Sequence, residues 1–214
     1  YTILIILSIC GSIFNNAYSQ TRNEKVELFF KALETKDIET IVLYSDDVLK
    51  IWAEDYGKDT IYANILFGLR DIHIGQRNYD KAIERNNELV LVNKEIYDET
   101  NELYIYSVAT QADLYYEVQD YRNALSFYKI SSTNYPLLLG SLHQETVRHK
   151  MQYAFCLLTN GFAELASAEY IKIIDSQETF NSLSEFQKDE VIDLCGSCYL
   201  KLNDYDNAIK YKLQ

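Results

Sequence analysis

Two cysteines near the C-terminal end of the sequence have the spacing of a redox site. Cys195 and Cys198 are separated by two residues, as in thioredoxin-like proteins. Such a site needs a strand–helix–strand context and a helix N-terminus that lowers the thiol pKa. The pair lies instead inside a stretch of helical spacing, where a free cysteine packs as a small hydrophobic residue. We expect both thiols in the core; a disulfide between them, formed after export, is the alternative.

The three histidines do not form a metal-binding pattern. His73, His143 and His149 are scattered and lack the H-x-x-x-H or H-E-x-x-H spacing of metal sites. We expect His73 to be half-buried in the core, and His143 and His149 to be solvated at the start of a helix. The sequence also contains no nucleophile elbow, P-loop or dinucleotide fingerprint. It therefore predicts no catalytic, cofactor-binding or metal-binding residues, and a protein that is not an enzyme.

Charge and turn-forming residues limit the class of protein. The formal net charge is −12, and the acidic residues are spread along the chain. A protein that binds nucleic acid needs a basic face for the phosphates, so nucleic acid is not an expected partner. The sequence has only one proline and seven glycines. Strand-rich folds need more turns than these residues can supply, which favours long helices.

An internal repeat organises the elements that position these residues. Ala82, Ala124, Ala166 and Ala208 each follow the previous alanine by 42 residues. Three of the alanines lie in related segments, NYDKAI, DYRNAL and DYDNAI. The third copy, GFAELA, keeps the alanine and shifts the aromatic residue by one position. A period in this range is typical of stacked supersecondary units, so the sequence predicts four of them.

The repeat resembles the tetratricopeptide repeat (TPR). In that family a small residue on the first helix and an alanine on the second allow a close crossing, and a proline ends the unit. Residues 194–209, LCGSCYLKLNDYDNAI, have this pattern, and Pro136 stands at the expected distance after Ala124. The usual unit has about 34 residues. Each unit here is longer by about two helical turns, and in this respect resembles the repeats of kinesin light chains and their bacterial relatives.

The resemblance implies an all-α fold, a right-handed α-solenoid of antiparallel helix pairs with about ten helices and no sheet. It covers residues 58–214 as four units, the last of them incomplete. Residues 20–57 have helical spacing of apolar residues but Thr40 in place of the alanine. We interpret them as degenerate TPR-like capping helices. Because the sequence begins at Tyr1 and ends at Gln214 inside a helical pattern, we expect a fragment of a longer protein.

Residues 1–19 are predicted to be a signal peptide whose basic start is missing. The first twenty residues carry no charge, and Ala17 and Ser19 form the small-x-small pattern of a cleavage site. The apolar run is shorter than the roughly 20 residues of a membrane span. We expect cleavage after Ser19, no membrane span in the mature chain, and an exported protein, periplasmic or extracellular. The alternatives are a retained anchor, a buried N-terminal helix, or a lipid on Cys10.

The resemblance also implies a scaffold that binds a protein or peptide in a concave groove lined by the first helices of the repeats. Aromatic and charged side chains in a groove suit peptide binding. We expect the binding residues to be Asp71, Tyr106, Asp113, Tyr116, Arg148, Phe155 and Asp193, whereas Tyr121 is expected in the core. The alternative is that the solenoid is the sensory or substrate-positioning arm of a larger enzyme or regulator. Its effector domain, a CHAT-type peptidase, a histidine kinase or a DNA-binding regulator, would then lie beyond Gln214.

Overall fold

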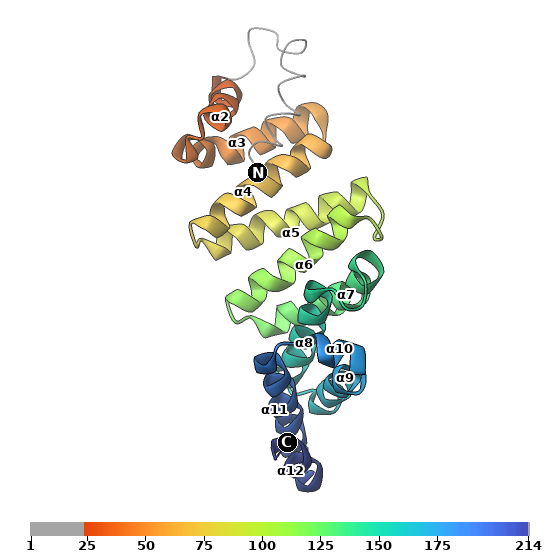
Figure 1. Cartoon of the computed structure of the whole chain (residues 1–214). Helices are drawn as coiled ribbons and strands as arrows, with labels where there is room; N and C mark the ends of the chain where they lie inside the picture. The colour runs from red at the N-terminus through yellow and green to blue at the C-terminus, as the bar shows by residue number, and fades with distance from the viewer. Residues whose placement is uncertain (1–23, 214) are drawn as a thin grey trace. The chain divides into compact units, whose positions relative to one another are not determined.

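The computed structural model describes residues 24–213, which form eleven helices and no strand (Figure 1). The chain divides into two compact units, the first ending at Glu99 and the second beginning at Thr100. The predicted signal peptide, with its cleavage site at Ser19 and the candidate lipid site at Cys10, lies outside the described residues.

The described part of the first unit, residues 24–99, contains two helix pairs. Its helices are α2 (Glu24–Thr35), α3 (Ile38–Tyr56), α4 (Thr60–Gly75) and α5 (Tyr79–Ile96). Each helix packs against the next one along the chain. Phe29, Ile41 and Leu66, which are at most 1% exposed, belong to one core that α2, α3 and α4 share. The apolar spacing of residues 20–57 therefore marks two helices that bury one face each.

The second unit contains three helix pairs and one short additional helix. Its helices are α6 (Glu102–Glu117), α7 (Tyr121–Leu139), α8 (Gln144–Thr159), α9 (Ala163–Asp175), α10 (Gln177–Ser182), α11 (Glu185–Lys201) and α12 (Tyr205–Lys212). α7 packs against α6 and α8, and α9 packs against α8 and α11. The prediction of an all-α fold built from consecutive helix pairs is confirmed within residues 24–213.

The four repeat alanines lie where the helices of each pair cross. Ala82, Ala124 and Ala166 are fully buried, and Ala208 is 1% exposed. Ala124 packs in one cluster with Ala112 of the preceding helix and with Tyr128. A methyl group at these positions lets two helix backbones approach closely, so the predicted register of the repeat is confirmed.

The turn inside each helix pair also repeats. The residue before the second helix's N-cap has a positive φ in every pair, at Lys36, Arg77, Gln119, Gly161 and Asn203. In four of the five turns the next residue is an aspartate or asparagine whose side chain accepts a hydrogen bond from the helix backbone, namely Asp37, Asn78, Asp120 and Asp204. Phe162 holds this position in the fourth turn and makes no side-chain cap. The aspartate or asparagine of the repeated motif is therefore the N-cap of the second helix.

Two features depart from the simple repeat. The family pattern predicted that Pro136 ends the unit, but the helix continues past this residue. α7 continues to Leu139 and stops where Gly140, with φ of 94°, donates its N–H to the Pro136 carbonyl over 3.1 Å. A proline inside a helix removes its own N–H donor, and its ring crowds the carbonyl group four residues earlier. α7 nevertheless continues past Pro136 and ends at Gly140, which adopts a positive φ. The second helix of the next pair is shorter: α9 has 13 residues against 19 in α7, and α10 follows after a break at Ser176.

Candidate functional site

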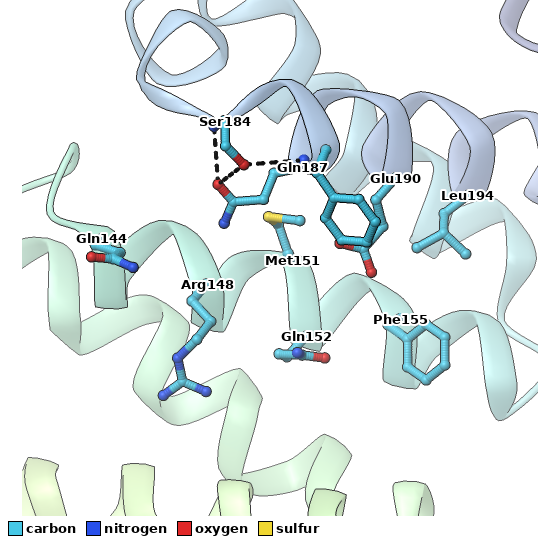
Figure 2. Close-up of a pocket in the computed structure, with 10 residues that line it drawn as sticks. Gln144, Arg148, Met151, Gln152, Phe155, Ser184, Gln187, Glu190 and Leu194 are labelled. Atoms are coloured by element: carbon cyan, nitrogen blue, oxygen red, sulfur yellow. Dashed lines mark hydrogen bonds between the residues drawn. The ribbon is translucent and has the colours of Figure 1, made fainter.

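The 42-residue period brings equivalent positions together on the first helices of neighbouring pairs. Arg148 on α8 is equivalent to Glu190 on α11, and Gln144 and Gln152 are equivalent to Phe186 and Leu194. All six side chains line one cavity between α8 and α11, with a volume of about 510 Å³ (Figure 2). We call it the α8–α11 cavity.

The α8–α11 cavity combines apolar and amide side chains. Phe155 and Leu194 are half-buried, and Phe186 is 77% exposed although it is a phenylalanine. Gln144, Gln152 and Gln187 supply amide groups. Such a lining can bury an apolar side chain and form hydrogen bonds with a peptide backbone.

Local capping positions Gln187 in this lining. α11 starts with a capping box, in which the Gln187 Oε1 accepts a hydrogen bond of 3.0 Å from the backbone N–H of Ser184. The Gln187 N–H in turn donates to the Ser184 hydroxyl over 3.3 Å. The amide nitrogen of Gln187 points toward α8 (Figure 2). The first turn of α11 therefore fixes the orientation of this amide group.

Arg148 is held by carboxylates and is not an isolated positive charge. Its two terminal nitrogens each donate to one oxygen of Asp113, over 2.8 Å, and Nη2 lies 2.7 Å from Glu145. Asp113 also accepts a 2.7 Å hydrogen bond from the Tyr128 hydroxyl. Burial alone would raise the pKa of Asp113, but the hydrogen bonds and charge of Arg148 dominate and lower it. Two carboxylates thus neutralise the guanidinium of this cavity-lining residue.

His149 is buried, and the prediction that it is solvated was wrong. Its side chain is fully buried between the rings of Tyr128 and Tyr135, at centroid distances of 5.1 and 4.6 Å. Nδ1 lies 2.7 Å from the Ser131 hydroxyl and Nε2 lies 2.8 Å from Nη2 of Arg148. Because arginine can only donate, Nε2 must accept and the proton of the neutral imidazole lies on Nδ1. Burial lowers the pKa of His149 to about 4.

Of the other two histidines, one is exposed as expected and one is more buried than expected. His143 is exposed and is the N-cap of α8. His73, expected to be half-buried, is 4% exposed, and burial lowers its pKa.

The predicted groove aromatics and the predicted core tyrosine form one cluster. Tyr116, Tyr121 and Phe155 meet edge to face, with ring centroids 5.3–5.7 Å apart. All three are half-buried. Tyr121 packs against the buried cluster of Ala112, Ala124 and Tyr128, as expected for a core residue, but it is only half-buried and shares this place with Tyr116. Tyr121 begins α7, the second helix of its pair, and its ring extends toward the first helices, where Phe155 covers it.

The seven predicted binding residues are only partly brought together. Arg148 and Phe155 line the α8–α11 cavity, while Asp113 and Tyr116 contact these two residues from behind. Tyr106 is 39% exposed and packs against Tyr135 at 6.0 Å.

The two remaining predicted residues form ion pairs. Asp193 pairs with Lys212 of α12. Asp71 lies in the first unit and pairs with Arg70 over 2.7 Å. The sequence reasoning missed Gln144, Gln152, Phe186, Glu190 and Leu194. The 42-residue period applied to Arg148 identifies one of them, Glu190.

The cysteines of the described chain are core residues. Cys156, Cys195 and Cys198 are free and fully buried, and burial raises the pKa of Cys195 to about 12 and that of Cys198 to about 11. These thiols stay protonated, so the pair packs in the core as expected. Between residues 24 and 213, no group of histidine, cysteine and acidic side chains is arranged to hold a metal ion. No helix in the same range combines the length and apolarity needed to cross a membrane.

Comparisons with known proteins identify the fold. No model of a known protein family matches the sequence, and no curated protein matches it. A kinesin light chain from Podosopora anserina with nearly identical TPR-like repeats is 13% identical, with a TM-score of 0.62 over 88% of this chain and 90% of that one. BtubC from P. vanneervenii is 13% identical, with a TM-score of 0.58 over 84% and 72%.

A third solved structure has the same architecture. YrrB, described as a TPR protein with an unusual peptide-binding site, is 10% identical, with a TM-score of 0.57 over 94% of this chain and 87% of that one. The fold is therefore that of a TPR α-solenoid, as the 42-residue repeat predicted.

Proposed function

We propose that this chain is a scaffold that binds an extended peptide segment of another protein in the α8–α11 cavity. The observation that supports this proposal is the lining of the cavity. Exposed and half-buried apolar side chains lie there beside glutamine amides, on two helices of neighbouring repeats. The fold is shared with YrrB, whose structure is described as having an unusual peptide-binding site.

The lining suits an extended peptide with an apolar anchor. Phe155, Phe186 and Leu194 offer aromatic and aliphatic surface that an anchor side chain would cover. A bound peptide backbone must find partners for its N–H and C=O groups. The amides of Gln144 and Gln152 can both donate and accept, so they can serve either group.

The charge of the cavity favours a basic residue next to the anchor. Glu190 lines the cavity, and no ion pair of its carboxylate is found in the described residues. Arg148 is already neutralised by Asp113 and Glu145. The expected ligand therefore carries lysine or arginine beside its apolar residue.

A peptide display library panned on the full chain tests the proposal. We expect enrichment of peptides with an apolar residue close to lysine or arginine. The affinity of an enriched peptide, measured by fluorescence anisotropy, should fall by about 2 kcal/mol in Phe186→Ala. Because Phe186 is 77% exposed, this variant should keep its thermal stability. Glu190→Gln should weaken the binding of only those peptides that carry a basic residue.

Phe162→Ala is the matched control. Phe162 is 50% exposed at the start of α9 and does not line the cavity. The Phe162→Ala variant should bind the enriched peptides with the same affinity as the unmodified chain. Equal losses in Phe186→Ala and Phe162→Ala, or no enrichment at all, would refute the proposed groove.

We also propose that the protein is exported to the periplasm or the medium, on the basis of the signal-like sequence of residues 1–19. Mass spectrometry of the mature protein should find Gln20 at its N-terminus. An intact Tyr1, or a lipid on Cys10, contradicts this. The alternative role as an arm of a larger enzyme or regulator is tested by the gene sequence beyond Gln214.

A further inference from the structure

A second cavity in the second unit is lined by lysines. It has a volume of about 510 Å³ and lies among α7, α8, α9 and α10. Lys129, Lys150 and Lys172 line it, one from each of the three long helices. We call it the lysine cavity. Its volume is within the range of small-molecule sites.

The lysine cavity arises from the irregular second pair of the second unit, α8 and α9. α9 ends at Asp175, and the chain turns at Ser176 before α10 begins. Ser176 and Thr179, on either side of the start of α10, line the cavity. In the preceding pair, the second helix is α7, which continues for 19 residues without such a break. The cavity is therefore a property of this pair and not of the repeat.

The charges of the lysine cavity oppose those of the whole chain. The chain has a formal net charge of −12, yet the cavity lining contains three lysines and one acid, Glu169. Glu169 pairs with Lys172 over 2.7 Å. No ion pair of Lys129 or Lys150 is found between residues 24 and 213. Two lysines without a carboxylate partner therefore line one cavity, and an anion bound there would be attracted to both.

Polar side chains in the same lining add hydrogen-bond donors. Ser141, in the turn between α7 and α8, lines the cavity, as does the half-buried Tyr153. Burial raises the pKa of Tyr153, so its hydroxyl stays a donor, and its ring offers a flat face to an organic ligand.

We propose that the lysine cavity binds a small organic polyanion, a molecule that carries phosphate groups or several carboxylates. The site is separate from the α8–α11 cavity. Lys150 and Tyr153 lie on the opposite side of α8 from Arg148 and Phe155, because each residue advances the helix by about 100°. The two sites can therefore be tested independently.

Calorimetric titration of the full chain with inorganic pyrophosphate tests this proposal. At about pH 8 and low ionic strength, lysines remain charged and screening is weak. We expect one binding site, and affinity at least about ten-fold lower in the double variant K129Q/K150Q. The affinity of each single variant for pyrophosphate should be about three-fold lower. If the double variant does not fold, the two single variants are compared instead. Citrate, titrated in parallel, distinguishes a preference for phosphate from one for carboxylate.

One further variant should act in the opposite direction. Glu169→Gln frees Lys172 from its ion pair and should tighten pyrophosphate binding by about three-fold or more. Glu164→Gln, on the exposed part of α9 outside the lining, is its control and should change nothing.

Lys31→Gln with Lys50→Gln is the control for K129Q/K150Q. Both lysines are exposed in the first unit, and their replacement changes the net charge equally. Absence of pyrophosphate binding overturns the proposal. So does an equal loss in the two double variants, because it would indicate nonspecific attraction.

Discussion

His149 is expected to make the second unit less stable as the pH falls from about 6.5 to about 4. Its pKa is lowered from 6.5 to about 4 because burial disfavours the imidazolium; the Asp113 carboxylate opposes this effect and the Arg148 guanidinium adds to it. In this range the unfolded chain binds a proton that the folded chain does not. The free energy of unfolding must therefore decrease as the pH falls.

The magnitude follows from the pKa difference. One pKa unit corresponds to about 1.4 kcal/mol. The loss from His149 is therefore about 2 kcal/mol at about pH 5, and it levels off near about 3 kcal/mol below pH 4.

The other charged groups around the ring are Asp113 on α6 and Glu145 and Arg148 on α8. The pKa of Asp113 is lowered from 3.8, so its stabilising effect is lost only at still lower pH. Arg148 remains charged throughout. The ring also contacts Tyr128 and Tyr135 of α7, whose pKa values burial raises, so both stay neutral. The loss between about pH 6.5 and about pH 4 thus comes from His149 within this cluster.

A comparison with His149→Gln isolates this effect. Glutamine keeps an amide for hydrogen bonding but does not titrate. Hydrogen exchange of the α8 amides, corrected for intrinsic rates, gives the free energy of opening at about pH 7 and about pH 5. The unmodified chain should lose about 2 kcal/mol more than the variant between these values. His73 in the first unit also has a lowered pKa, but its effect is common to both proteins.

The fluorescence of Trp52 provides an internal control. This single tryptophan lies in the first unit and reports on that unit alone. Its urea unfolding curve should respond to pH equally in both proteins. An identical response of the α8 amides in the unmodified chain and in His149→Gln would refute the reasoning, since His149 would then not be the group that titrates.

Two stability predictions follow from the repeat. Ala124→Leu should lower the free energy of unfolding by about 1–3 kcal/mol, because Ala124 is fully buried against Ala112 and Tyr128; a neutral result in thermal melts would show a wrong register. Phe162→Asp should raise stability by about 1 kcal/mol relative to Phe162→Ala, because it supplies the N-cap that α9 lacks. Equal melting temperatures of the two Phe162 variants would contradict the capping argument.

Much of the fold could be predicted because the repeat places the same chemistry at the same helical positions. Ala124 and its equivalents needed to be small, and the aspartate or asparagine that precedes three of them caps a helix. The burial of His149 was predictable by the same reasoning. Its equivalents, Ser107 and Val191, are 2% and 0% exposed. The prediction failed because it relied on the position of His149 near the start of a helix and not on its place in the repeat.

The end of α7 was mispredicted for a different reason. Pro136 was expected to end the unit, but α7 continues past it to Leu139 and ends where Gly140 adopts a positive φ. Tyr121 packs against the core but is only half-buried, and part of its cover comes from Phe155, which belongs to the next helix pair.

The sequence by itself determined the helices, their pairing and their turns, because these depend on periodic apolar residues, small residues at crossings and caps within a few positions. The tertiary structure alone decided what each surface can do. Arg148 is neutralised by Asp113, 35 residues earlier, and this contact depends on how α8 packs beside α6 and α7. The lysine cavity depends on three helices that bring Lys129, Lys150 and Lys172 to one space. The net charge and the solvent exposure of a site depend on neighbouring residues from different repeats. The distances between these residues cannot be read from the linear order of the sequence.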